Sequence, residues 1–282
     1  MLGILIAAGM GRRLKEVTIQ TPKCLVPMNA QGQTMLEQSL KNFWAAGCTE
    51  CVIITGHAQE AFQQVDLPEN VRFLHNADYR NNNILHSLMT AREFFDRPLL
   101  ISYSDIWVEP FIYQQLIHTE GDAVLAVDTS WQGYYQGRDE HPIEQAEKVR
   151  YRSTNEPAKV VALGKILPTS STSPENQDAQ TGEFLGLMKL SATAAKQFRK
   201  DFLALDERLN HHSPFQQAAS WQQAYLTDLI QYQLEHGQPY SAALVAKGWA
   251  EFDTVQDYQR LPLTAKLQQL KSLENPSPIS LD

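Results

Sequence analysis

The chain has 282 residues, which is enough for one large domain with a sizeable buried core. Hydrophobic residues make up 43% of the sequence and charged residues 20%, and no run approaches the roughly 18 apolar residues that span a bilayer. The net charge of −8 argues against a general nucleic-acid binder, because phosphate backbones favour basic surfaces. We therefore expect a soluble protein that binds neither membrane nor nucleic acid.

The N-terminus runs directly from Met1 into the apolar stretch Leu2-Gly3-Ile4-Leu5-Ile6. It has neither a basic leading region nor a small-residue cleavage site, so it predicts a first strand and not a signal peptide. We expect a cytoplasmic protein.

Short apolar runs alternate with segments of helical periodicity through the first half of the chain. The predicted strands are Leu2 to Ala7, Cys51 to Thr55, Val71 to Leu74, Leu99 to Ser102 and Ala123 to Val127. The predicted helices are Met35 to Ala46, Ile84 to Phe95 and Pro110 to His118. This βαβ alternation predicts an α/β fold, with an open and mostly parallel sheet flanked by helices.

Beyond Asp128 the pattern changes to short strands followed by helices, which we interpret as a mixed extension of the same sheet. The predicted strands are Val149 to Arg152, Val160 to Ile166 and Phe184 to Leu190, and the predicted helices are Ala192 to Phe202 and Trp221 to Glu235. Two stretches are polar and rich in residues that interrupt helices and strands. They predict a mobile loop at Pro168 to Thr181 and a flexible tail at 262–282.

Three cysteines fit a reducing compartment. Cys48 and Cys51 have the spacing of a CxxC motif, but they lie across a predicted helix-to-strand junction with no second pair for zinc. We expect core packing for these thiols.

A glycine-rich and arginine-rich loop follows the first strand, at the edge where open α/β sheets bind ligands. Its sequence is Ala7-Ala8-Gly9-Met10-Gly11-Arg12-Arg13-Leu14. Glycines let backbone N–H groups approach a polyphosphate, and arginines match phosphate oxygens with forked donors. The dinucleotide-binding pattern GxGxxG would require glycine at position 14, where this chain has Leu14. The Gly-Lys-Ser/Thr end of a P-loop is also absent from this loop. The alternative is a tight turn with solvated arginines.

Lys23 follows this loop and is framed by Pro22 and Pro27, which restrict the backbone around it. A framed lysine beside a phosphate loop suggests a fixed cation.

The two linked motifs, AAGMGRRL and TPKCLVPM, resemble the signature of the nucleoside-triphosphate transferase superfamily. The resemblance spans roughly residues 1–261 and is closest to the phosphocholine cytidylyltransferase group, with its inositol-phosphate and aminoalkylphosphonate relatives. Sugar-1-phosphate nucleotidyltransferases usually have Gly-Thr-Arg-Leu where this chain has Gly11-Arg12-Arg13-Leu14. Further matching segments are Thr55-Gly56-His57, Asn81-Asn82-Asn83-Ile84-Leu85-His86-Ser87-Leu88, Tyr103-Ser104-Asp105, Gly182-Glu183-Phe184-Leu185-Gly186 and Glu251-Phe252-Asp253-Thr254.

The resemblance implies a Rossmann-like sheet of the nucleotide-diphospho-sugar transferase type, with a small acceptor-binding elaboration. It implies a single domain over 1–261, divided into a nucleotide-binding half at 1–128 and an acceptor-binding half at 129–261.

The resemblance also implies Mg²⁺, held by Asp105 and Asp253, since two carboxylates beside a polyphosphate suit this hard cation. As lone residues both aspartates could instead be helix caps. Lys23 would contact the α-phosphate or the attacking phosphate, and Arg13 the β- and γ-phosphates, with backbone N–H groups from Gly9 and Gly11. Arg12 is expected at the surface.

The base and the acceptor are expected at other parts of the same site. The resemblance suggests that Asn82, Asn83 and Ser87 read the base or the acceptor; the alternative is an Asn-rich helix cap. Ala8 and Gly56 would contact base and ribose through their backbones. By analogy, Lys165 and Glu183 face the acceptor.

Several aromatic residues could hold an ammonium head group by cation–π attraction if they converge, although such residues pack interiors more often. They are Trp107, Trp131, Tyr134, Tyr135, Trp221 and Trp249.

The sequence therefore predicts an enzyme that transfers a nucleoside monophosphate, CMP from CTP first, to a small phosphorylated acceptor such as phosphocholine or an aminoalkylphosphonate. The nucleoside triphosphate and the acceptor are its partners, and a homodimer is compatible with the sequence. The alternatives are a sugar-1-phosphate nucleotidyltransferase, a non-catalytic nucleotide-sensing module, and an NAD-binding oxidoreductase, which lacks its fingerprint glycine.

Overall fold

The structure is a computed structural model that describes residues 1–29, 32–153, 156–167 and 178–260. The predicted tail at 262–282 lies outside the described residues, as does most of the predicted loop between Pro168 and Thr181. The end of that stretch is described, and its last two residues belong to a strand. Within the described ranges, no helix is long and apolar enough to cross a membrane.

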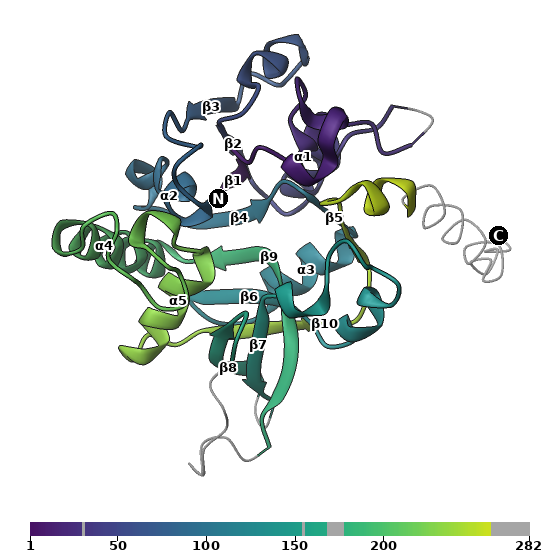
Figure 1. Cartoon of the computed structure of the whole chain (residues 1–282). Helices are drawn as coiled ribbons and strands as arrows, with labels where there is room; N and C mark the ends of the chain where they lie inside the picture. The colour runs from purple at the N-terminus through teal and green to yellow at the C-terminus, as the bar shows by residue number, and fades with distance from the viewer. Residues whose placement is uncertain (30–31, 154–155, 168–177, 261–282) are drawn as a thin grey trace, which may run out of the picture.

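The described strands form one nine-stranded sheet, in the order β3-β2-β1-β4-β9-β6-β10-β8-β7 (Figure 1). Its first four strands are parallel: β1 (Leu2–Ala7), β2 (Glu50–Thr55), β3 (Val71–His75) and β4 (Leu99–Tyr103). Every residue of β1 is buried, because this strand lies between two others and has helices on both faces. The predicted α/β sheet is confirmed.

The second half of the chain extends the same sheet. The added strands are β6 (Ala123–Asp128), β7 (Lys148–Arg152), β8 (Ala158–Gly164), β9 (Gln180–Leu190) and β10 (Ser241–Val245). Strand β9 runs antiparallel between β4 and β6 and also pairs with β7, whereas β10 lies parallel to β6. The sheet is therefore mixed, as the change of pattern after Asp128 predicts.

A separate two-stranded ribbon crosses the edge of this sheet. It pairs β5 (Ile106–Val108) with β11 (Trp249–Glu251) in antiparallel register. The backbone N–H of Phe252 donates to the carbonyl of Asp105 over 2.7 Å. This pairing brings the chain around residue 253 beside the end of β4.

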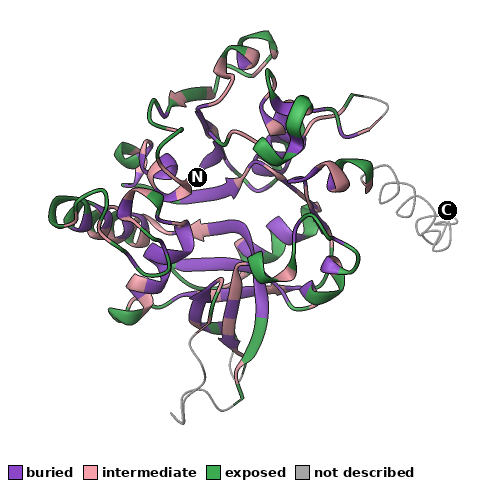
Figure 2. Cartoon of the chain, viewed as in Figure 1, coloured by how far each residue is buried: buried purple, intermediate pink, exposed green. Residues whose placement is uncertain are grey.

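Helices cover both faces of the sheet, with α1 and α3 on one side and α2, α4 and α5 on the other (Figures 1 and 2). They are α1 (Met35–Ala45), α2 (Ile84–Met89), α3 (Pro110–His118), α4 (Ala192–Arg208) and α5 (Leu226–Glu235). A capping box of Thr34 and Glu37 begins α1, and Asn83 caps α2. The largest buried side chains, among them Phe43, Phe198 and Trp221, lie beneath these helices.

Two predicted helices are shorter than their apolar patterns suggested. Helix α2 ends at Met89 and is followed by a separate 3-10 turn at Arg92–Phe94. The segment predicted from Trp221 divides into a 3-10 turn at Trp221–Gln223 and α5, which begins at its own cap, Tyr225. Both breaks occur where turn hydrogen bonds replace the helical ladder, which apolar spacing does not reveal.

All three cysteines are buried free thiols, as core packing predicts. Burial raises the pKa of Cys24 and of Cys48 to about 12, and it also raises the pKa of Cys51.

Because the thiolate is the nucleophile, we expect iodoacetamide at mildly alkaline pH to leave the native thiols unmodified. The measurement is intact-mass spectrometry over time. The same reagent in concentrated guanidinium chloride is the control, and it should modify all three. Rapid labelling of native Cys48 or Cys51 would contradict core burial and reopen a reactive role for the CxxC spacing.

Candidate active site

A cavity of about 360 Å³ opens where β1 and β4 end. All of the site residues predicted from sequence except Gly56 line it: Ala8, Gly9, Gly11, Arg13, Lys23, Asn82, Asn83, Ser87, Asp105, Lys165, Glu183 and Asp253. Gly56 instead packs against the Ala8 carbonyl and Tyr79, where an added Cβ would lie 2.6 Å from that oxygen, and it lines a neighbouring surface hollow. The cavity therefore gathers residues from both halves of the chain.

The glycine-rich loop leaves β1 at Ala8 and turns back at Gly11. Gly11 has a φ of 59°, a conformation that favours glycine, and an added Cβ there would lie 3.0 Å from Lys23 and from Thr18. The Thr18 hydroxyl donates to the Gly11 carbonyl over 2.8 Å. The loop is thus closed over Lys23, while Gly9 has open space around its Cα.

Lys23 is the cation at the centre of the site. Its ammonium lies 3.1 Å from Asp105 Oδ2 and also donates to Asp253 Oδ1. Arg13 forms an ion pair with the other oxygen of Asp253 and donates to Gln145. Arg12 is exposed and contacts Met10, as expected for a surface residue.

These contacts set the charge states of the buried groups. Burial alone would lower the pKa of Lys23. The negative charges of Asp105 and Asp253 outweigh burial, so the pKa lies above its usual value and the ammonium stays charged. Burial raises the pKa of Asp253, whereas the contact with His141 and the charges of Lys23 and Arg13 outweigh this and hold the pKa below its usual range. The site therefore contains an ionised Asp253 carboxylate beside a fixed cation.

The carboxylate oxygens of Asp105 and Asp253 are not used as helix caps. Helix α3 has Glu109 at its N-cap, and the turn after Asp253 is capped by Asp257, which accepts from the N–H groups of Asp253 and Thr254. The alternative of two capping aspartates does not hold here.

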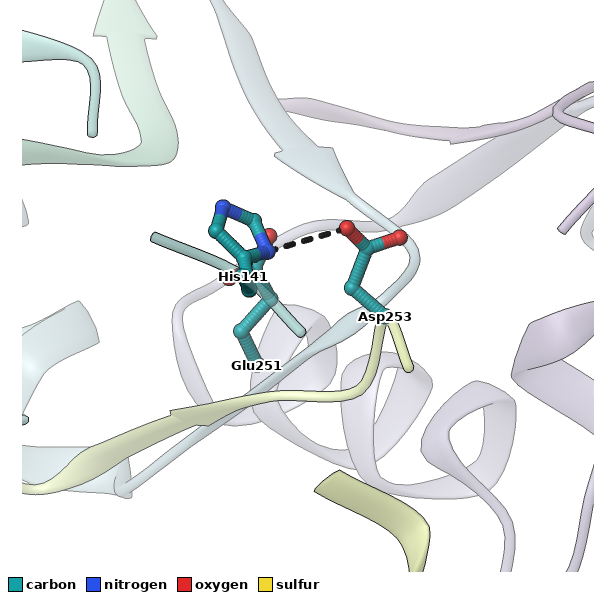
Figure 3. A group of neighbouring side chains, drawn as sticks. All are labelled: His141, Glu251 and Asp253. Carbon is teal, nitrogen blue, oxygen red and sulfur yellow. Dashed lines mark ion pairs between the residues drawn. The ribbon is translucent and has the colours of Figure 1, made fainter. Parts of the chain in front are cut away.

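The residues fit a magnesium ion. Two carboxylates from different strands already face one cation, the Lys23 ammonium, which is the arrangement of hard oxygen ligands that Mg²⁺ prefers. A second grouping adds His141 Nδ1, 3.1 Å from Asp253 Oδ2, and Glu251, with the three ligand atoms within 4.8 Å of one another (Figure 3). A ring nitrogen is a softer ligand, so the Asp105 and Asp253 pair suits Mg²⁺ better.

The asparagine-rich segment forms its own hydrogen-bond network. The amide nitrogen of Asn76 donates 2.9 Å hydrogen bonds to Asn82 Oδ1 and to the Ser87 hydroxyl. The amide nitrogen of Asn82 donates in return to Asn76 Oδ1. Asn83 accepts from Ile84 N as the cap of α2 and donates to the Gln223 carbonyl. Asn83 thus has the capping role that was the alternative expectation, although it also lines the cavity.

The other side of the cavity is built from β7 and β9 and is rich in carboxylates. Glu183 lies in β9, and Glu147 immediately precedes β7. Tyr103 and Thr227 donate to the two oxygens of Glu147, over 3.0 and 3.3 Å, and Tyr135 donates to Glu183 Oε1. Burial raises the pKa of Glu147 to about 7 and that of Glu183 to about 8.

Four of the six aromatic residues considered from sequence are linked by ring contacts, from Trp131 through Tyr135 and Tyr134 to Trp249, but the six do not gather around the cavity. Tyr135 and Trp249 line the cavity, whereas Trp221 lies in the core with Phe202 and Phe215. The indole N–H of Trp249 donates to Asp128. Trp131 packs against Tyr135 in a separate small cluster, and Tyr134 stacks on Trp249 at 4.3 Å between ring centroids. Four further phenyl or phenol rings line the cavity: Tyr79, Tyr103, Phe184 and Tyr225.

Arg138 was missed by sequence reasoning, together with Asn76, His141, Glu147 and Glu251. Its side chain is 1% exposed and binds both oxygens of Asp257, over 2.8 and 2.9 Å, and Glu251 over 3.0 Å. It thereby fastens the segment 131–141 to the segment that carries Asp253. No local pattern marks these residues, because their partners lie far away in sequence.

Comparisons with known proteins identify a family and several relatives of this chain. The model of the "MobA-like NTP transferase domain" family matches residues 3–153. CTP:phosphoglutamine cytidylyltransferase of Campylobacter jejuni is 25% identical over 92% of this chain and 98% of its own length. CMP-5'-(3-aminopropyl)phosphonate synthase of Streptomyces rubellomurinus is 31% identical over 44% of this chain, a match that spans only 20% of that protein.

A solved structure of CTP:phosphocholine cytidylyltransferase from Streptococcus pneumoniae shares the fold. It superposes with a TM-score of 0.67 at 18% identity, over 93% of this chain and 98% of that one. Since the family model covers more than half of the 282 residues, the chain belongs to the family of MobA-like NTP transferase domains.

Proposed function

We propose that this protein transfers CMP from CTP to a small phosphorylated acceptor, of the phosphocholine or aminoalkylphosphonate kind, and releases pyrophosphate. The observation that carries the proposal is the convergence of Lys23, Asp105 and Asp253 beside a glycine-rich loop, in a cavity with carboxylates on its other side. The names of two relatives, a phosphoglutamine cytidylyltransferase and an aminopropylphosphonate synthase, support CTP and an amino-headed acceptor.

In this proposal the two halves of the chain divide the substrates. Residues 1–128 bind the nucleotide: Gly9, Gly11 and Arg13 take the triphosphate, and Ala8 with the asparagine network lies at the base. Residues 129–261 bind the acceptor, with Lys165 and Glu183 in its pocket.

The reaction is an in-line displacement at the α-phosphorus. An acceptor phosphate or phosphonate oxygen forms the new P–O bond, the bond to the β-phosphate breaks, and pyrophosphate leaves with the electron pair. No protein nucleophile is required. Lys23 stabilises charge on the transferred phosphoryl group, and Arg13 orients the leaving phosphates, so catalysis rests on positioning and electrostatics. Asp105 and Asp253 would hold Mg²⁺, which neutralises phosphate charge when bound.

The first test is pyrophosphate release with Mg²⁺, pairing CTP, UTP, GTP, dTTP and ATP with different acceptors. The acceptors are phosphocholine, 2-aminoethylphosphonate, inositol 1-phosphate and glucose 1-phosphate. We expect release with CTP and an amino-headed acceptor. Release only with glucose 1-phosphate would replace the proposal by a sugar-1-phosphate nucleotidyltransferase. Release with no pair, together with nucleotide binding, would favour a sensing module.

Replacing Lys23 should lower turnover far more than it affects folding. We expect Lys23→Ala to reduce kcat by roughly 100- to 1,000-fold, the usual effect of removing one preorganised charge-stabilising donor. Arg12→Ala removes a neighbouring exposed cation and should leave kcat unchanged. Circular dichroism of both variants checks the fold. A folded and fully active Lys23→Ala protein would rule out the proposed role.

Turnover should depend on a divalent cation through the two aspartates. We expect EDTA to abolish pyrophosphate release and Mg²⁺ to restore it. Asp105→Asn and Asp253→Asn should each raise the Mg²⁺ concentration that gives half-maximal rate, since a neutral amide is a weaker ligand for a hard cation. Asp96→Asn, at an exposed aspartate paired with Arg97, is the matched control. An unchanged magnesium titration in both site variants would contradict this assignment.

A further inference from the structure

Glu183 has a hydrogen-bonding position that the protein itself does not fill. Tyr135 donates to Oε1, whereas Oε2 is buried and receives no hydrogen bond from the described residues. The residue as a whole is 5% exposed and lines the cavity. Buried carboxylate oxygens are normally satisfied, so an unfilled one beside a ligand cavity indicates a donor on the ligand.

The fold holds Glu183 in this position. It lies in β9 between Asp128 of β6 and Lys148 of β7. Gly182 packs directly on Val127, where an added Cβ would lie 2.5 Å from that side chain. Strand β9 therefore cannot shift to give Glu183 another partner without moving its neighbour.

The surroundings of Glu183 favour an incoming cation. Burial raises its pKa to about 8, and the carboxylates of Glu251 and Asp128 raise it as well. Arg138 opposes this rise but is already bound to Asp257 and Glu251. A positive group at Oε2 would keep the carboxylate ionised and would form a charge-assisted hydrogen bond.

Two of the aromatic rings that line the cavity, Tyr225 and Tyr135, already contact cations of the protein. The ammonium of Lys165 lies 4.3 Å from the ring centroid of Tyr225. The guanidinium of Arg138 lies 5.3 Å from that of Tyr135 and 4.7 Å from that of Tyr134. A head group at these two rings would therefore compete with charges that the protein already places there. The unfilled oxygen of Glu183 offers it a hydrogen bond that no group of the described residues takes.

We infer that the acceptor carries an ammonium group with at least one N–H, which it donates to Glu183 Oε2. This rests on the proposed function and narrows its substrate class to primary, secondary or tertiary ammonium compounds. A trimethylammonium head carries the same charge but no N–H, so it would leave the buried oxygen unsatisfied.

The test is a series in which N–H groups are replaced one at a time while the charge stays constant. Phosphoethanolamine and its N-methyl, N,N-dimethyl and N,N,N-trimethyl forms are compared with CTP and Mg²⁺, measuring kcat/KM. We expect the first three to be used and the trimethyl form, phosphocholine, to be at least about tenfold poorer, as loss of a charged hydrogen bond predicts. Equal or better use of phosphocholine would overturn the inference and leave the cytidylyltransferase proposal intact.

A variant tests the residue. Glu183→Gln keeps the size of the side chain but removes its charge and presents an amide to the ammonium. We expect its preference for phosphoethanolamine over phosphocholine to shrink at least about tenfold, with the KM for CTP unchanged. Glu144→Gln, at an exposed glutamate outside the cavity, is the control and should keep the preference. An unchanged preference in Glu183→Gln would overturn the assignment.

The remaining outcomes separate the two proposals. If the enzyme uses glucose 1-phosphate but none of the four compounds of the methylation series, the inference is overturned and nucleotidyl transfer remains in place. Absence of pyrophosphate release with every nucleotide and acceptor would overturn the proposed function and, with it, the inference.

Discussion

The contact of one ammonium with two carboxylates is the interaction on which the site depends. Asp105 and Asp253 lie far apart in sequence, and a buried and a half-buried carboxylate brought together without a cation would repel each other. Lys23 removes this penalty. The β5–β11 ribbon and the closed glycine loop around Lys23 therefore stabilise each other, since each positions a charge that the other requires.

A second arrangement of charges fixes the part of the chain that completes the site. Among the described residues, the strand before Asp253 pairs with β5 alone, so hydrogen bonds of the main sheet do not hold it. Arg138 supplies the missing constraint by binding Asp257 and Glu251, and Asp257 in turn accepts from the backbone N–H of Asp253. Forked guanidinium contacts of this kind define an orientation as well as a distance. Asp253 is thereby held by its backbone before any ligand binds.

The strands that sequence predicted well are those that bury both faces. Continuous apolar runs mark Leu2–Ala7 and Ala123–Asp128, because both strands lie inside the sheet. A glycine-rich loop after such a strand indicates the edge of the sheet at which ligands bind. Strands β5, β10 and β11 escaped prediction because they are three to five residues long and are defined by distant partners. The same holds for Arg138, whose main partner is 119 residues away.

Under the proposed function, the distribution of charge would let one cavity distinguish the two ends of an acceptor. The cations Arg13 and Lys23 lie on the side where phosphates are expected, whereas Glu147 lies just before β7 and Glu183 lies in β9. An acceptor with a phosphate at one end and an ammonium at the other matches both sides in one orientation only. The reverse orientation would take the phosphate away from Lys23 and Arg13 and the ammonium away from Glu183, so both pairings would be lost. Loss of both pairings in the wrong orientation therefore contributes to specificity.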